Sequence, residues 1–201
     1  MDQKTIYTHI AKSLQDFSLP RWQEIPDVGL YLKQTGKYLA EMLQPLEGVT
    51  ISASMISNYV KHRLISSPVK KMYSREQIAA LAFIAVAKTV LPLENIRLLM
   101  EMYREILEPE QAWTFFCREL EEMLQSVCTA EGAMLSGGRA PQDETGPGGL
   151  PENRMQPGLA GTDMLRSTII AIAYKVCLDK AFTAVRKEQG RQEHDRQAER
   201  R

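Results

Sequence analysis

The residues best suited to chemistry in this sequence are cations grouped in a stretch that contains no carboxylate. Residues 48–75 include no Asp or Glu, although the whole chain carries 25 acidic and 25 basic side chains. The basic side chains of this stretch are Lys61, Arg63, Lys70, Lys71 and Arg75. A local excess of positive charge in a chain without net charge is expected where a surface meets a polyanion, so double-stranded DNA is the predicted partner.

A helix predicted at about 52–62 presents part of these cations together with small polar side chains. The apolar positions predicted to face inward are Met55, Ile56, Tyr59 and Val60. The remaining surface carries hydroxyl and amide groups, which bond base edges or phosphates, and a helix that starts at Thr50 or Ser52 directs free N–H groups at a phosphate. The polar positions predicted to contact DNA are therefore Thr50, Ser52, Ser54, Ser57, Asn58, Lys61 and His62.

The elements that follow this helix are predicted from a proline and from apolar spacing. Residues 64–73 cannot be helical across Pro68, so they are predicted to form a tight extended excursion. Ser74 then begins a helix, with Gln77 completing a capping box. The run at 78–87 is almost wholly apolar, which indicates that this helix is buried on most sides.

The rest of the chain is predicted to be helical, with one interruption. Helices are predicted to follow Asp27, Pro92 and Pro109, and a last helix with two apolar faces is predicted at 162–187. The polar tail after it is predicted to fray. Residues 130–161 hold eight of the chain's 12 glycines and four of its 10 prolines, which indicates a flexible linker.

The sequence gives no signal for an enzyme or a membrane protein. The three histidines are His9, His62 and His194, and none pairs with Ser, Cys or Asp in a recognisable catalytic arrangement. No glycine-rich phosphate loop follows a predicted strand. We therefore expect no catalytic residue and no cofactor. The chain opens without an apolar leader and contains no apolar run long enough to cross a bilayer, so a cytoplasmic protein is expected.

Three cysteines, Cys117, Cys128 and Cys177, lie among apolar neighbours on predicted helices. Their odd number and the lack of a Cys-x-x-Cys pair argue against a disulfide framework and a closed zinc site. The prediction is buried, reduced thiols and no metal. The alternative is a metal-sensing pair of Cys117 and Cys128.

Part of the chain resembles the DNA-binding head of MerR-type regulators. The segments that carry the resemblance are Gly48-Val49-Thr50, Ile56-Ser57-Asn58-Tyr59, Leu64-Ile65, Pro68 and Lys71-Met72-Tyr73-Ser74. The resemblance implies a winged helix-turn-helix that acts as a homodimer. It also implies that Tyr59 and Tyr73 contact DNA together with the cations. Ser57 and Asn58 stand where that family has Arg and Tyr.

A second resemblance covers roughly residues 18–125. It is carried by Arg21-Trp22, Glu24-Ile25-Pro26-Asp27, the segment 54–61 and Lys70-Lys71-Met72-Tyr73. These segments are similar to a bacterial family labelled domain of unknown function 1836. The label names no activity, so a regulatory role rests on the winged-helix resemblance.

These observations predict an all-α fold, with a MerR-like winged helix-turn-helix embedded in a helical bundle and a small β-like wing. The predicted organisation is an N-terminal helical segment at 1–47, the winged helix-turn-helix at 48–107, a helix at 108–129, the linker at 130–161, a C-terminal helix at 162–187 and a polar tail at 188–201.

The function expected from this fold is transcription regulation by a DNA-binding homodimer. The apolar stripes at 109–128 and 163–187 either supply the dimer contact or pack within one chain. The alternative is an all-helical adaptor that binds protein through the acidic helix at 94–125 and the last helix. The sequence identifies no small-molecule effector.

Overall fold

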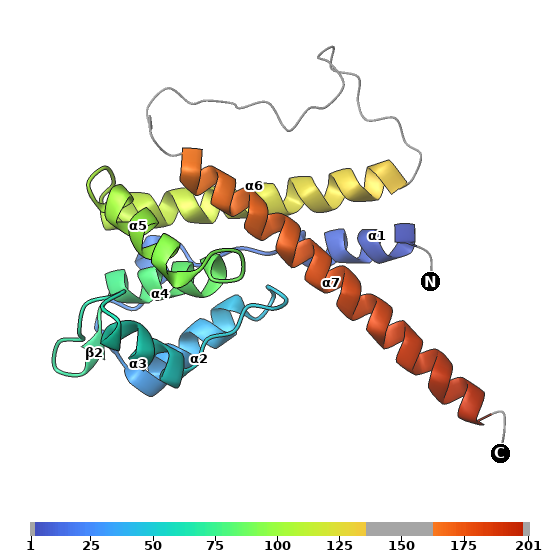
Figure 1. Ribbon diagram of the computed structural model, residues 1–201, viewed down its shortest axis with the longest axis horizontal. Helices are drawn as coiled ribbons and strands as arrows, with labels where there is room; N and C mark the ends of the chain where they lie inside the picture. Colours follow the sequence, from blue (N-terminus) through green and yellow to red (C-terminus); the bar gives the residue numbers. More distant parts are fainter. Residues whose placement is uncertain (1–2, 136–162, 199–201) are drawn as a thin grey trace, which may run out of the picture.

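A computed structural model of the protein describes residues 3–135 and 163–198, which are almost entirely helical (Figure 1). None of the described helices is both long enough and apolar enough to cross a membrane. The elements in chain order are α1 (Gln3–Leu14), the short 3-10 helix η1 (Trp22–Glu24), β1 (Leu30–Tyr31), α2 (Leu32–Leu43), α3 (Ala53–Lys61), β2 (Met72–Tyr73), α4 (Arg75–Ala87), α5 (Leu93–Arg104), α6 (Pro109–Leu135) and α7 (Asp163–Ala198).

Helix α4 lies at the centre of the core, as its apolar run predicts. Ile78, Leu81 and Ile84 are fully buried, Ala79 and Ala82 are buried as well, and Ala80 is half-buried. Helices α2, α5, α6 and α7 all pack against α4. A helix that is apolar on every side has no solvent face to present, and it is stable only when other helices surround it. The all-helical core expected from the sequence is therefore confirmed.

The start of α4 is fixed by the predicted capping box. The Ser74 hydroxyl accepts a hydrogen bond from the Gln77 backbone N–H at 3.3 Å, and the Gln77 side chain accepts one from the Ser74 N–H at 3.0 Å. Reciprocal bonds of this kind satisfy two of the N–H groups that a helix start otherwise leaves unpaired. The prediction at this position is confirmed.

A small antiparallel pairing joins two segments far apart in the sequence. Leu30 pairs with Tyr73 and Tyr31 with Met72. The sequence predicted that residues 30 and 31 belong to the helix following Asp27, and this is wrong, because α2 begins only at Leu32. The excursion at 64–73 is indeed extended, and it turns back on itself through a bridge between Val69 and Met72.

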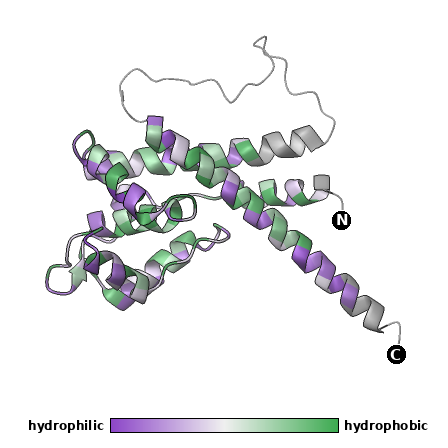
Figure 2. Ribbon diagram, viewed as in Figure 1, coloured by the Kyte–Doolittle hydropathy of each residue, from purple (hydrophilic) through white to green (hydrophobic). Residues whose placement is uncertain are grey.

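The two long helices, α6 and α7, exceed their predicted lengths. α6 continues to Leu135 rather than ending near 129, and α7 continues to Ala198 instead of fraying after 187. The end of α7 is rich in Glu, Arg, Lys and Gln, which are good helix formers, so a polar sequence is not a sign of a frayed one. Figure 2 shows this change from an apolar first half to a hydrophilic second half. The rest of the predicted linker, 136–161, lies outside the described residues.

The cysteines differ from the prediction at one position. Cys117 is a free, buried thiol, and burial, with a smaller contribution from Glu121, raises its pKa to about 12 despite the opposing charge of Arg21. Cys177 is disulfide-bonded, so the expectation that all the thiols are reduced is wrong. An odd number of cysteines excludes a fully paired framework but does not exclude a single bond.

Candidate nucleic-acid interface

Helices α2 and α3 form a closely packed pair joined by the loop at 44–52. Gly36 of α2 makes this approach possible, because a Cβ atom there would lie 3.3 Å from the Ala53 backbone nitrogen. Gly48 in the loop has a φ of +79°, and a Cβ atom would clash with the Asp179 carboxylate of α7. The loop is held further by the Thr183 hydroxyl, which donates to Glu47 at 3.1 Å. Helix α7 therefore braces the turn between α2 and α3.

Helix α3 has a buried side and an exposed polar side. Ile56 and Tyr59 are buried, and Met55 and Val60 are half-buried, as predicted. The ammonium of Lys88, the residue that follows α4, lies 3.7 Å from the Met55 sulfur, and burial lowers its pKa. The exposed side carries Ser54, Ser57, Asn58, Lys61 and His62, which form the outer face of α3.

Two hydroxyls of this region have partners within the protein. Ser52 caps α3 and accepts a hydrogen bond from the Met55 N–H at 3.3 Å, while Ser57 donates to the Ala53 carbonyl at 3.0 Å. Thr50 is exposed just before the cap. Capping already occupies the Ser52 oxygen, so its predicted role in DNA contact is secondary to starting the helix.

The end of α3 places Arg63 in a left-handed conformation, with a φ of 55°. The Leu64 N–H donates to the Tyr59 carbonyl and the Arg63 N–H to the Val60 carbonyl, each at 2.9 Å. This is a Schellman motif, whose left-handed position is usually glycine. The Arg97 guanidinium of α5 donates to the His62 carbonyl at 2.5 Å. Arg97 was not predicted from the sequence, because it lies 35 positions from His62 and no local pattern connects the two residues.

The tip of the extended excursion is a two-residue hairpin turn formed by Lys70 and Lys71. The Met72 N–H donates to the Val69 carbonyl at 2.9 Å, and the two lysines have φ values of 49° and 65°. Positive φ at both central positions defines a type I′ turn, which strongly favours Asn-Gly. A residue with a Cβ atom costs about 1 kcal/mol at each such position. Both lysine side chains are exposed.

Three of the residues predicted to contact DNA have other roles. Tyr59 and Tyr73 are each 4% exposed, so they pack in the core and cannot reach a groove. Arg75 donates to the Ile25 carbonyl at 2.8 Å, lies 3.7 Å from the Asp27 carboxylate and stacks over Trp22 at 5.8 Å. Arg75 thus fastens the start of α4 to the N-terminal segment. The prediction of DNA contact is therefore corrected for Tyr59, Tyr73 and Arg75. These side chains instead hold neighbouring elements of the fold in place.

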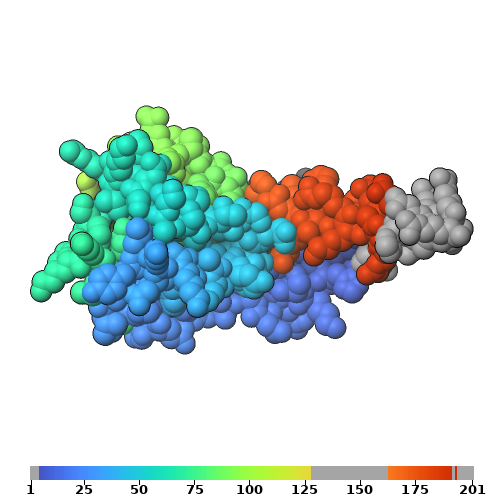
Figure 3. All heavy atoms as spheres, turned by 90° about the horizontal axis from the view of Figure 1, so that it is seen from below, coloured from blue at the N-terminus to red at the C-terminus, as the bar shows by residue number. Residues whose placement is uncertain are grey.

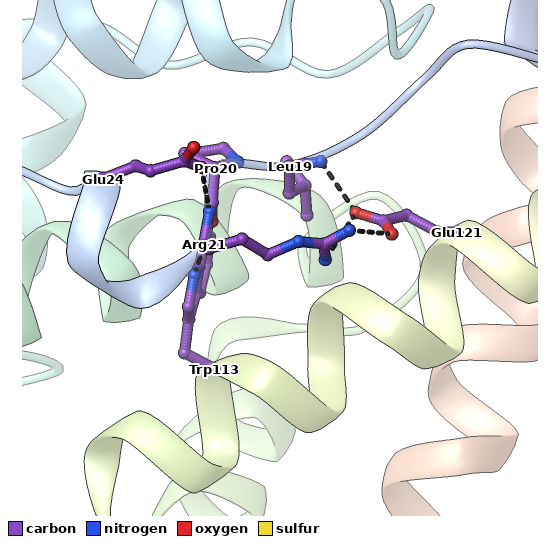
Figure 4. Close-up of polar contacts among 6 residues, drawn as sticks. All are labelled: Leu19, Pro20, Arg21, Glu24, Trp113 and Glu121. Carbon is purple, nitrogen blue, oxygen red and sulfur yellow. Dashed lines mark hydrogen bonds and ion pairs between the residues drawn. The ribbon is translucent and has the colours of Figure 1, made fainter.

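The N-terminal segment that Arg75 contacts is also bound to α6, through hydrogen bonds and an ion pair made by residues 19–21 (Figure 4). The Leu19 N–H donates to Glu121 at 2.9 Å, Arg21 forms an ion pair with the same carboxylate at 3.1 Å, and the Trp113 indole donates to the Pro20 carbonyl at 2.9 Å. These contacts link α6 through the N-terminal segment to β1 and the hairpin.

Apart from Thr50 and the capping residue Ser52, the exposed side chains that were predicted to contact DNA lie at one end of the molecule. Figures 1 and 3 show α3 and the hairpin side by side, at the end opposite to the C-terminal part of α7. We call this surface the basic face; its members are Ser54, Ser57, Asn58, Lys61, His62, Arg63, Lys70, Lys71 and Arg97. Among the residues that the structure describes, no three His, Cys, Asp or Glu side chains form a group able to hold a metal ion.

The geometry defines a helical protein with a closely packed helix pair, a short hairpin and a cationic surface formed by both. The model of the family called domain of unknown function (DUF1836) matches residues 20–122, about half of the chain. The protein therefore belongs to this family, as its resemblance predicted. No curated protein and no solved structure matches the chain.

Proposed function

We propose that this protein is a DNA-binding transcription regulator, in which α2 and α3 form a helix-turn-helix and the hairpin forms a wing, as in MerR-type regulators. One observation carries the proposal. In the described part of the chain, the non-glycine residues with positive φ are Arg63, Lys70 and Lys71, all cations on the basic face. Strained backbone that persists at exposed cations points to a role for their charge, since glycine or asparagine is more stable there.

In this proposal, α3 enters the major groove. Asn58 offers an amide that bonds adenine at two points, and Ser54 offers a hydroxyl that fits several base edges. Lys61 and Arg63 lie at the end of α3, while Lys70 and Lys71 reach flanking phosphates from the wing. Arg97 adds a cation from α5. Outside residues 48–75 the chain carries 25 acidic and 20 basic side chains, and this excess of negative charge disfavours other orientations on a polyanion.

The proposal is tested by titrating labelled duplex DNA with the purified protein at several salt concentrations. Counterion release predicts that log affinity falls with log salt with a slope of about −0.9 for each phosphate contact. The cations of the basic face predict a slope between about −3 and −5. Failure to bind any duplex at low salt, with no nucleic acid copurifying, rejects the proposal and favours the protein-binding adaptor.

Changing the wing tip to Asn-Gly tests the trade-off between stability and charge. The variant Lys70→Asn with Lys71→Gly is expected to raise the free energy of unfolding by about 1–2 kcal/mol, because both residues tolerate positive φ. It is also expected to reduce the salt slope by nearly 2. Denaturant unfolding and DNA titration measure the two effects. Equal DNA affinity in the variant and the wild type contradicts the wing assignment.

The proposed regulator is a homodimer that pairs through α7. Leu178 and Phe182, 44% and 59% exposed, continue a stripe from Tyr174 to Val185. Positions 164, 171, 178 and 185 lie seven residues apart, which is the repeat of a coiled coil. An exposed apolar stripe of this kind is self-complementary, so a second copy of α7 is its proposed partner.

Charge placed on this stripe is expected to separate the dimer. The variant Leu178→Glu with Phe182→Glu leaves the core intact, because both side chains are exposed. Light scattering measures the mass in solution, and we expect a dimer for the wild type and a monomer for the variant. The change Gln189→Glu, at an exposed polar position of the same helix, is the control. A monomeric wild type at micromolar concentration excludes this dimer.

A further inference from the structure

A pocket of about 410 Å³ lies between α4, α5 and α6, and the start of α7 closes one side. Its half-buried walls are formed by Ala80 and Phe83 of α4, Met100 of α5 and Ala112 of α6. Deeper in the pocket, Phe116 meets Phe83 edge-on, with ring centroids 5.3 Å apart. The pocket is large enough for a small molecule and is not needed for the DNA contacts proposed above.

The polar side chains deep in this pocket, Tyr103 and Trp113, already have hydrogen-bond partners within the protein. Among the described residues, no buried side-chain nitrogen or oxygen lacks a partner. The Trp113 indole, which lines the pocket, is already bonded to the Pro20 carbonyl. Because a polar group loses its hydrogen bonds to water on entering such a site, the inserted part of a ligand must be apolar.

The mouth of the pocket carries charges that are not neutralised by each other. Glu76, Arg104 and Glu108 line it and are exposed. The described ion pairs include none of these three side chains. Two carboxylates beside one guanidinium give the mouth a net negative charge, and the aromatic walls add the negative faces of their rings. This combination favours a cation.

We propose that the pocket binds a lipophilic cation, whose apolar body lies against Phe83 and Met100 and whose cationic head lies between Glu76 and Glu108. Burial of the apolar body supplies most of the affinity, because the head stays in contact with water. The carboxylates then select the sign of the head group.

The same pocket adjoins the base of the wing. Gln77 and Ser66 both line it, and the Gln77 amide donates to the Ser66 carbonyl at 2.8 Å and to its hydroxyl at 3.0 Å. Gln77 also accepts from the Ser74 N–H. One side chain thus joins both ends of the hairpin to α4. A ligand that displaces Gln77 changes the wing, and this regulatory step rests on the proposed function.

The binding site is tested without DNA, by calorimetry with octyltrimethylammonium. We expect a dissociation constant of about 0.1–1 mM, given what a ligand of this size can gain from burial. Octanoate, with the same chain and the opposite charge, is expected to bind about tenfold more weakly. No binding of the ammonium at millimolar concentration overturns the site, and tighter binding of octanoate overturns the cation preference.

Two variants locate the ligand. Ala112→Phe fills the pocket and is expected to abolish binding, whereas Ala40→Phe, at an exposed position of α2, leaves it unchanged. Glu76→Gln with Glu108→Gln keeps the volume of the pocket and removes its two carboxylates. This variant is expected to bind octyltrimethylammonium about five- to tenfold more weakly, whereas octanol, which has the same chain and no charge, should bind equally well to both proteins. Glu101→Gln, exposed on α5 outside the pocket, is the control. Unchanged ammonium binding in both pocket variants contradicts the assignment.

The regulatory step is tested by repeating the DNA titration with saturating octyltrimethylammonium. We expect a several-fold change in DNA affinity for the wild type and none for Gln77→Ala, in which the link between pocket and wing is missing. Calorimetric binding without any change in DNA affinity leaves the site in place and rejects the coupling. A protein that binds the ammonium and no DNA rejects the proposed function alone.

Discussion

Replacing Lys61, Lys70 and Lys71 with alanine is expected to lower the affinity for duplex DNA about a hundredfold at physiological salt. Each lysine that neutralises a phosphate contributes about 0.9 to the salt slope, so the slope is expected to fall by nearly 3. The triple variant should fold normally, because all three side chains are exposed. DNA titrations at several salt concentrations measure both quantities.

The matched control removes three cations from another part of the molecule. Lys12 of α1 and Arg186 and Lys187 of α7 are exposed and lie outside the basic face. Their replacement by alanine changes the net charge by the same amount, so it reports the effect of overall charge alone. The control variant is expected to lose less than threefold in affinity. If the two triple variants weaken DNA binding equally, the basic face is not the site of contact.

The side of α3 that contributes to the basic face could be predicted because its signals are local. The inward spacing of Ile56 and Tyr59, the Ser74 capping box and the apolar run of α4 each depend on neighbours in the sequence. These features are decided by helical periodicity and by capping, which act over one or two turns. The sequence therefore predicted which side of α3 faces solvent, and the structure agrees.

The features that escaped prediction depend on distant partners or on the whole fold. β1 exists because Leu30 meets Tyr73, 43 residues away, and two residues carry no strand pattern of their own. Arg75 lies in the cationic stretch but bonds the Ile25 carbonyl, which only the folded chain brings near. Charge in a sequence does not reveal whether a guanidinium faces solvent or fastens two segments together.

The left-handed lysines show a third kind of limit. Lys70-Lys71 lacks the Asn-Gly signature, so sequence reasoning predicts an extended excursion without a defined turn. The hairpin is instead imposed by the pairing of Met72 with Tyr31 and Val69, and the backbone strain at the tip is offset by that pairing. Residues whose backbone conformation opposes their own preference are thus identified only in the folded structure, and here two of them lie in the candidate site.

Replacing Glu119 with alanine is expected to lower the free energy of unfolding by about 3 kcal/mol, because it removes a buried carboxylate that is hydrogen-bonded and ion-paired to a partly buried guanidinium. Glu119 of α6 is 7% exposed and accepts hydrogen bonds from Arg166 of α7 at 2.9 and 3.3 Å. Arg118 contributes another at 3.2 Å. Glu122→Ala, at an exposed position of the same helix, is the control and should change stability by less than about 0.5 kcal/mol.

The same ion pair makes stability depend on acid pH. Burial alone raises the pKa of the Glu119 carboxyl, but the hydrogen bonds and charge of Arg166, with those of Arg118, outweigh it and lower the pKa below its ordinary value. The carboxylate therefore stabilises the fold above the ordinary carboxyl pKa, and this contribution is lost as the pH falls through the lowered one. Unfolding measured from neutral to acid pH should show the wild type converging on Glu119→Ala, since protonation removes the charge that the substitution removes. A difference between them that stays constant down to the most acid pH would show that packing, and not the charge of Glu119, joins α6 to α7.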